Sequence, residues 1–346
     1  MKDLFETMHE RLTRNEPLVL ATLIAGSGST PRDAGARMLV GNSGRIWGSV
    51  GGALAEHLVI EEAAALIAKR GGSSLGNYIL HENETADIDA KCGGEFTVFS
   101  QYLDVEIPGL IDFIEKGLAR FSEKEGTWFI MDVSGNPEGV SLILAAKDRV
   151  IASLGKIPAD TESLPQVMCK QSCILLERDG LRCFSQPLAA AGFVYVFGGG
   201  HVAQELVPLL DRLGFRCVVF DDRAEFTRQE LFPCAANVIR GEFEVIEKYI
   251  HLDKNDYVVI LTRGHRWDYE AEAFALRGKA AYIGVIGSKS KHAFVQGRLK
   301  EAGFTEAEIH APRVHAPIGM DIGSKTPAEI AVSIAAELIK VRAAAV

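Results

Sequence analysis

The 346-residue sequence lacks several features that would assign it to a common class of protein. It has six cysteines, too few for a disulfide scaffold in so long a chain, and none forms a C-x-x-C pair. No uncharged apolar run reaches the roughly 20 residues that cross a bilayer, so no membrane span is expected. Basic residues number 37 against 46 acidic ones, and the net charge of −9 argues against broad nucleic-acid binding.

What is present is ordinary globular composition, with 47% hydrophobic and 24% charged residues. At roughly 100–200 residues per domain, the length predicts two domains. The N-terminus has Asp3 and Glu6 where a signal peptide would have its apolar region. We therefore expect a cytoplasmic protein.

The first half, residues 1–187, is expected to be a mixed α/β domain. Short apolar runs bounded by glycine or proline are typical of buried strands, as at 18–24. The pattern does not fix the topology of this half. Helices are expected at 2–14, 51–69 and 109–121, and strands at 18–24, 36–40, 45–48, 76–80, 95–103, 127–132, 140–146 and 172–177.

The second half, residues 188–346, alternates strand and helix signals from 193 onward. Alternation at this spacing predicts parallel βαβ units and a doubly wound, Rossmann-like sheet. The boundary is placed near Gln186 and Pro187. Strands are expected at 193–197, 216–220, 236–239, 256–262, 281–286 and 312–315, and helices from 201 to 213 and at 243–250, 268–277, 290–302 and 327–342.

A glycine-rich turn follows the first strand of this second half. Gly198 to Ala203 fits G-x-G-x-x-A, and Asp221 ends the next strand, 23 residues after Gly198. This is the dinucleotide-binding fingerprint in its required context. Gly198 and Gly200 would let a phosphate approach the backbone at the start of a helix. His201 stands where many dinucleotide sites keep a small residue, so the turn serves NAD(P), another phosphate, or no ligand.

Two further strands end in polar loops at the same predicted edge. The first loop contains Arg263 and His265, and the second contains Gly287, Ser288 and Lys289. Ligands of open α/β sheets bind at the carboxyl ends of the strands. Arg263, His265 and Lys289 either surround an anionic ligand or lie on solvated loop tips. Together with the glycine turn, three loops are expected at this edge, and this favours an anionic ligand.

The last helix has its own start signal. Thr326 with Glu329 matches a capping box, and Pro327 occupies the first helical position.

The first domain offers two loops of interest. Ser49, Gly51 and Gly52 lead into a helix that carries Glu56, and this arrangement forms either a backbone anion nest or an ordinary tight turn. The second loop is Cys92-Gly93-Gly94, whose glycines leave the sulfur unshielded. Cys92 is either an activated thiol or a small residue at the entry of a strand. Cys169 and Cys173 have no nearby histidine or second cysteine pair to complete a zinc set.

Taken together, these segments resemble the XdhC/CoxI accessory proteins of molybdenum hydroxylases. They match in order over nearly the whole chain, although Ala53 replaces the family's third glycine and Ala90 its usual methionine. The matching segments are 21–32, 48–52 with Glu56, 92–94, 198–203, 262–265 with Asp268, 286–289 and 315–327.

The resemblance implies a chaperone that binds the molybdenum cofactor, holds it while its sulfido ligand is installed, and passes it to a xanthine-dehydrogenase-type apoenzyme. A cysteine desulfurase would be the second partner, and a cleft between the domains would shield the oxygen-sensitive compound. Cys92 would contact the thiophilic molybdenum. The implied cofactor site comprises Ser49, Gly51, Gly52, Glu56, Cys92, Gly93, Gly94, Gly198, Gly200, His201, Asp221, Arg263, His265, Gly287, Ser288 and Lys289.

Two other classes of protein stay open. One is an NAD(P)-dependent oxidoreductase, for which the sequence nominates no catalytic acid. The other is a noncatalytic scaffold whose glycine turn is vestigial. An accessory role is favoured over a catalytic one, and the sequence gives no oligomeric state, so a homo-oligomer also stays open.

Overall fold

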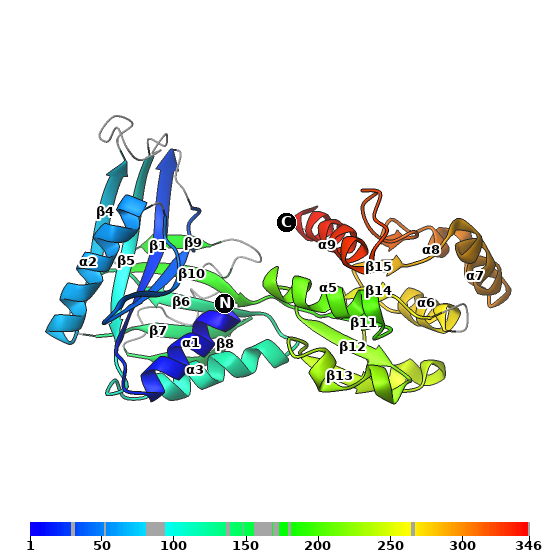
Figure 1. Cartoon of the computed structure of the whole chain (residues 1–346), viewed down its shortest axis with the longest axis horizontal. Coiled ribbons are helices and arrows are strands. Elements are labelled where there is room, and N and C mark those ends of the chain that lie inside the picture. Colours follow the sequence, from blue (N-terminus) through cyan, green and yellow to red (C-terminus); the bar gives the residue numbers. More distant parts are fainter. Residues whose placement is uncertain are drawn as a thin grey trace. The chain divides into compact units, whose positions relative to one another are not determined.

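A computed structural model shows two compact units, Met1–Ala189 and Ala190–Val346 (Figure 1). Within the described part, no helix is both long enough and apolar enough to cross a membrane. The structure describes residues 1–28, 32–51, 53–80, 94–135, 139–147, 149–155, 168, 173–178, 181–263 and 267–344.

The first unit contains two antiparallel five-stranded sheets, which we call sheet A and sheet B. Sheet A has the order β3-β2-β1-β5-β4, and sheet B has the order β8-β7-β6-β10-β9. The strands of sheet A are β1 (Leu18–Gly28), β2 (Arg37–Gly41), β3 (Gly44–Gly48), β4 (Ser73–Leu80) and β5 (Gly94–Leu103). Those of sheet B are β6 (Thr127–Asp132), β7 (Leu142–Ala146), β8 (Arg149–Leu154), β9 (Ile174–Arg178) and β10 (Leu181–Ala189).

Alternation along the strands explains how these layers pack. Leu18 and Leu20 of β1 face a core shared by sheet A, sheet B, α1 (Lys2–Thr13) and α3 (Leu110–Ala119). Val19, Ala21 and Leu23 face the opposite side, where they pack with α2 (Ala53–Lys69). Because both faces of β1 are buried, its sequence is a continuous apolar run.

The second unit is a six-stranded sheet in which every described pairing is parallel. Its order is β13-β12-β11-β14-β15-β16, which confirms the predicted Rossmann-like doubly wound sheet beside a mixed α/β half. The strands are β11 (Val194–Phe197), β12 (Cys217–Asp221), β13 (Asn237–Arg240), β14 (Tyr257–Ile260), β15 (Tyr282–Val285) and β16 (Val314–His315).

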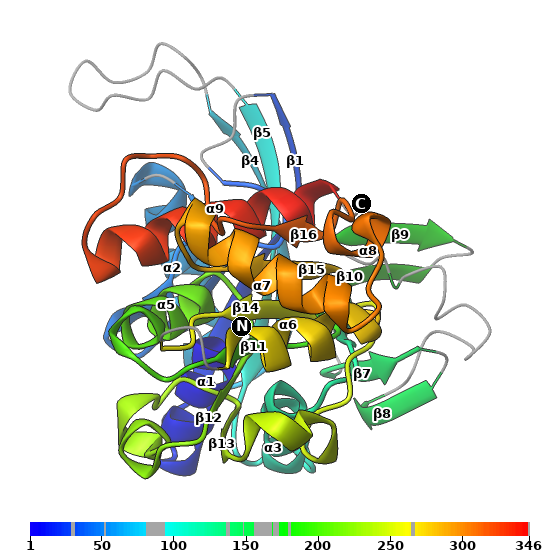
Figure 2. The same ribbon diagram turned by 90° about the vertical axis from the view of Figure 1, so that its right-hand side faces the viewer.

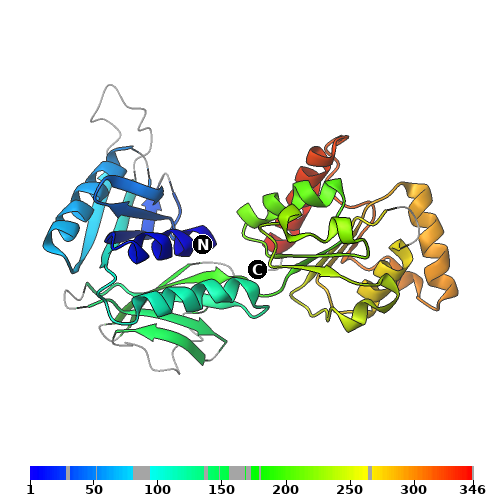
Figure 3. The ribbon, with the colours of Figure 1, turned by 60° about the horizontal axis from the view of Figure 1, so that its bottom comes forward.

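Helices cover both faces of this sheet (Figures 2 and 3). Side chains of α5 and α9 pack on one face, and those of α6 and α7 pack on the other. The helices are α5 (His201–Arg212), α6 (Asp268–Arg277), α7 (Lys289–Glu301), α8 (Glu306–Ile309) and α9 (Pro327–Ala344). Short 3-10 turns lie at η1 (Arg120–Ser122), η3 (Ala224–Phe226), η4 (Gln229–Leu231) and η5 (Phe243–Lys248).

The structure differs from the sequence-based expectations in several elements. Strands β8 and β10, the short helix α8 and the 3-10 turns η1, η3 and η4 were not predicted, and the helix expected at 243–250 is the 3-10 helix η5. Val245 has φ −137° and ψ 38°, which interrupts helical geometry at this point.

The topology places the candidate site. Strand β11 pairs with β12 on one side and with β14 on the other, and chain order reverses between these neighbours. The loops after the three strands therefore meet at one carboxyl edge, at the topological switch point where open α/β sheets bind ligands.

Candidate functional site

The three glycines of the turn after β11 have different roles. Gly198 has φ +105°, and a Cβ added there would lie 2.7 Å from the carbonyl oxygen of Leu261. A Cβ on Gly199 would collide with the carbonyl oxygen of Phe226. Around Gly200, by contrast, nothing lies within 4 Å of the added Cβ. The fold itself requires the first two glycines, whereas Gly200 leaves open space in front of the backbone.

The turn leads directly into the N-terminus of α5. Gly200 is the N-cap residue, so no side chain accepts a hydrogen bond from the first N–H groups of the helix. His201 begins the helix and is exposed. Free backbone N–H groups and the positive end of the helix dipole suit an anion at this position.

Asp221, the acidic residue of the fingerprint, is 1% exposed at the end of β12. Its carboxylate accepts the backbone N–H of Gly199 at 2.8 Å and that of Arg223 at 3.0 Å. The guanidinium of Arg223 donates to the same carboxylate from Nε at 2.9 Å and from Nη2 at 2.8 Å. Burial alone would raise the pKa of Asp221, but the hydrogen bonds from Arg223 and Gly199 hold that pKa below its ordinary value.

The engagement of Asp221 limits which ligands can bind at the glycine turn. In an NAD site the acidic residue accepts a ribose hydroxyl, but Asp221 is already engaged by four N–H groups, two from backbone and two from Arg223. Arg223 lies 3.9 Å above the ring of Phe226, which fixes its plane. In dinucleotide sites an arginine near this position accommodates the 2′-phosphate of NADP, so the arrangement is compatible with NADP or with another ligand that carries a phosphate.

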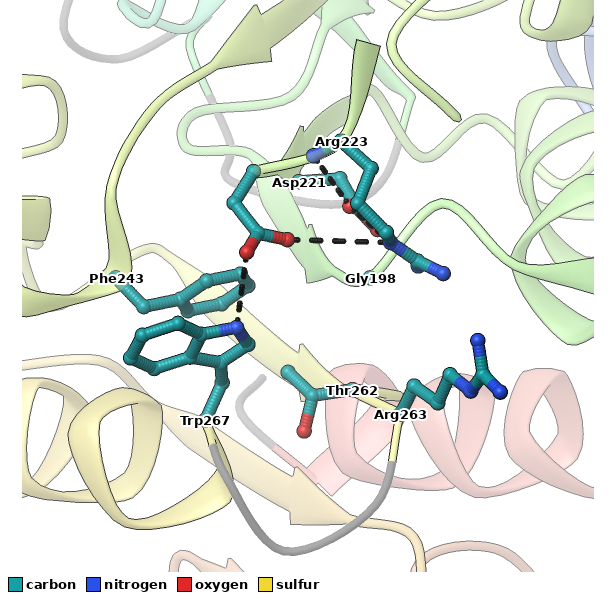
Figure 4. A pocket seen from close by; sticks show the side chains of 8 residues that line it. Gly198, Asp221, Arg223, Phe243, Thr262, Arg263 and Trp267 are labelled. Carbon is teal, nitrogen blue, oxygen red and sulfur yellow. Dashed lines mark hydrogen bonds and ion pairs between the residues drawn. The ribbon is translucent and has the colours of Figure 1, made fainter. Parts of the chain in front are cut away.

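A pocket with a cavity volume of about 330 Å³ opens beside the turn (Figure 4). Two aromatic rings line it, those of Phe243 and Trp267, stacked 5.5 Å apart at 12°. The indole N–H of Trp267 donates to Asp222 at 3.0 Å. Two guanidiniums and two carboxylates complete the polar part of the lining. The residues around the pocket are Gly198, Asp221, Asp222, Arg223, Phe243, Thr262, Arg263 and Trp267.

A buried polar cluster lies behind this pocket. Asp268, at the start of α6, is fully buried, accepts the hydroxyl of Thr262 and pairs with Lys291 Nζ at 2.6 Å. Lys291 belongs to α7, so the pair joins the first turn of α6 to the first turn of α7. Burial, together with the charge of Asp268, raises the pKa of Glu272 to about 8.

The structure brings together three of the predicted cofactor residues in this pocket, Gly198, Asp221 and Arg263. Gly200 and His201 follow directly in the turn and the helix. Gly287, Ser288 and Lys289 follow β15, which lies beyond β14 in the strand order, and they are not among the pocket residues. Ser288 acts as the N-cap of α7, and Lys289 is exposed.

The predicted residues of the first unit form a separate local contact. Glu56 accepts the hydroxyl of Ser49 and pairs with Arg45 Nη1 at 3.0 Å, and Ser49 also donates to the carbonyl of Gly51. Gly94 begins β5 and pairs with Gly28. The remaining predicted residues lie outside the described ones: Gly52, Cys92, Gly93 and His265.

Sequence reasoning missed Arg223 as a site residue, along with Asp222, Phe243 and Trp267. A signal for Arg223 was present, since it stands two residues after the acidic residue of the fingerprint. The stacked pair of Phe243 and Trp267 joins segments far apart in sequence, and only the fold brings them together.

Fold and site together define a class: a two-unit protein with a Rossmann-type second unit, whose glycine-turn pocket offers arginines and backbone N–H groups. Family models agree with this class. A model described as the XdhC Rossmann domain matches residues 194–338, and one described as the XdhC and CoxI family matches residues 11–78. The chain belongs to the XdhC and CoxI family.

Individual relatives are distant but extend over the chain. A probable xanthine dehydrogenase subunit of Bacillus subtilis is 25% identical, covering 98% of this chain and 97% of that protein. The uncharacterized protein YqeB of Escherichia coli is 24% identical over 95% of this chain, which spans only 44% of that protein. A crystal structure described as a xanthine dehydrogenase from Bacillus halodurans has a TM-score of 0.77 at 21% identity, covers 99% of this chain and 96% of its own, and shares the fold.

Proposed function

We propose that the chain is a maturation factor for a xanthine-dehydrogenase-type molybdenum hydroxylase. In this proposal the second unit binds the phosphate-bearing tail of the molybdenum cofactor while the sulfido ligand is installed and the cofactor is passed to the apoenzyme. Family membership supports the maturation role, and the name of the Bacillus subtilis relative supports the class of client.

The observation that carries the choice of ligand is the occupied carboxylate of Asp221. A ribose diol would have to displace Arg223 from its bidentate ion pair with the buried Asp221 carboxylate, so the pocket disfavours NAD. A phosphate group needs no such displacement. It meets the N-terminus of α5, the open space at Gly200 and the exposed Arg263.

The residues present therefore fit a phosphorylated tail. The bound cofactor would supply the molybdenum chemistry, whereas this chain binds and orients the tail. Trp267 offers an aromatic surface in the pocket for a flat ring of the ligand.

Transfer to a client tests the proposal. Full-length protein, purified without oxygen from cells that make the cofactor, is mixed with a molybdenum-free apo-hydroxylase, and xanthine oxidation is followed. We expect the loaded protein to activate the apoenzyme, and the Arg263→Ala protein, purified in the same way, to activate it less. Full cofactor loading without any activation would contradict the maturation role, and release of nicotinamide nucleotides instead of a pterin would favour the oxidoreductase.

A further inference from the structure

A second polar site lies in the first unit, between sheets A and B. Arg37 of β2 is 4% exposed, and its Cα pairs with that of Thr22 on β1, which is fully buried. The guanidinium lies 4.7 Å from the ring centre of Phe129 on β6. A positively charged side chain is thus enclosed in the apolar core that the two sheets share.

The hydrogen bonding of Arg37 is incomplete. Nη1 contacts the thioether sulfur of Met1 at 3.3 Å, whereas Nε and Nη2 have no hydrogen-bond partner in the described part of the chain. No ion pair joins Arg37 to a described carboxylate. Burial lowers the pKa of Arg37 to about 9, as expected for a guanidinium that has lost water without gaining a counter-ion.

The two unpartnered nitrogens lie on the same edge of the guanidinium. Nε–H and one N–H of Nη2 are parallel there, and this fork matches the two oxygens of a carboxylate-type group. Unpaired buried charges are rare because they are costly, so an unfilled fork in a core indicates a ligand.

Other unpartnered polar atoms belong to residues next to Arg37 in the strand registers or packed beside the same sheets. Oγ1 of Thr22 and Oε1 of Gln186 are both buried without a hydrogen-bond partner in the described structure. Gln186 pairs with Phe129 across β10 and β6, and its Nε2 donates to the carbonyl of Gly35 at 3.3 Å. The side chain of Cys173 lies against Gly35, so a thiol completes the group.

We propose that Arg37 anchors a binding site for a small planar oxyanion, a carboxylate or bicarbonate, between the two sheets of the first unit. The fork of Arg37 donates to two oxygens of the anion, and the hydroxyl of Thr22 is a further donor. The burial of Arg37 limits the ligand to a small ion. This site is independent of the pocket in the second unit.

The alkylation rate of the Cys173 thiol should report whether the anion is bound. Burial raises the pKa of Cys173, and the charge of Arg37 opposes that rise. A bound anion neutralises Arg37, so it removes this opposing effect and leaves less thiolate for alkylation.

Thermal unfolding of the full chain tests the site. Bicarbonate, formate and phosphate are each compared with chloride at equal ionic strength and pH. We expect bicarbonate or formate to raise the unfolding midpoint of the wild type with the logarithm of concentration, and to slow alkylation of Cys173. Bicarbonate alone would identify that ion, and a response to formate would identify a carboxylate.

Three variants complete the design. Arg37→Met removes an uncompensated buried charge, so it should fold with an unchanged or higher midpoint and lose both anion responses. Arg37→Lys keeps the charge without the fork and should lose most of the response. Arg14→Met, which removes an exposed arginine, should respond like the wild type. The proposal is overturned if Arg37→Met still responds, if only phosphate acts, or if no anion exceeds chloride.

Discussion

At the scale of single residues, the glycines of the turn separate folding from binding. Gly200→Val should fold, because its side chain enters open space, and it should abolish cofactor retention by filling the approach of the phosphate. Gly198→Val is the matched control, since its positive φ and the nearby Leu261 carbonyl predict a loss of stability instead. Circular dichroism and ligand content, measured on both variants, separate the two effects. A folded Gly200→Val protein with wild-type ligand content would refute the assignment.

The cationic side chains at the carboxyl edge of the sheet are expected to contribute unequally to ligand binding. Arg263 lines the pocket, so Arg263→Ala should weaken ligand binding by about 1–3 kcal/mol through loss of a charge-assisted contact. Lys289 is exposed and absent from the lining, so Lys289→Ala should have a smaller effect and serves as the charge-matched control. Affinities of both variants at low and high salt provide the measurement. Equal losses, or an affinity that salt does not change, would count against the pocket.

Cys92 remains the residue at which the molybdenum contact is predicted, and it lies outside the described residues. Cys92→Ser should leave folding intact and reduce cofactor retention or sulfuration, because a hydroxyl is a poor ligand for a soft metal. Wild-type Cys92 should also be alkylated faster than the buried Cys217, and bound cofactor should protect it. Retention and sulfuration by Cys92→Ser at the wild-type level would argue against this contact.

At the scale of elements, α6 carries a carboxyl group that should make stability depend on pH. The pKa of Glu272 is about 8 in the folded chain, well above the ordinary value of 4.5. Above pH 4.5 the unfolded chain ionises this group while the folded chain keeps it protonated, so stability falls as pH rises to about 8.

Glu272→Gln should therefore have a higher free energy of unfolding than the wild type at pH 8, by on the order of a few kcal/mol, and the two free energies should converge below pH 4.5. Thermal unfolding across this range checks the expectation. Glu247→Gln, at an exposed position, should unfold like the wild type at every pH in this range. A pH-independent difference for Glu272→Gln would mean that packing, not titration, sets the effect.

Sequence patterns predicted the elements of the second unit far better than those of the first. In the second unit, α-helices directly follow the strands β11, β14 and β15. The last helix, α9, begins with the predicted capping box of Thr326 and Glu329, which the structure confirms. In the first unit, β10 pairs with β6 across about fifty residues of chain and contains Pro187, so local pattern did not reveal it.

The candidate site also contains some features that the sequence predicted and others that only the structure revealed. The glycine turn and Asp221 are local signals and were found, whereas the ion pair that occupies Asp221 depends on side-chain geometry. The unpaired fork of Arg37 is likewise invisible in sequence, because it depends on which atoms sheet B places opposite β2.

At the scale of the whole molecule, the two proposed anion sites, one in each unit, differ in design. The second unit offers an open pocket with one exposed and one ion-paired arginine, which suits a large phosphorylated ligand. The first encloses one guanidinium in a core and suits a small ion.

The most direct test of the cofactor assignment is mass spectrometry of the small molecules released from full-length protein purified without oxygen. We expect a molybdenum-bearing pterin with its phosphate or nucleotide tail in the wild type, and its loss from Gly200→Val. Nicotinamide nucleotides in place of the pterin, or no small molecule from protein made in cells rich in the cofactor, would contradict the proposed function.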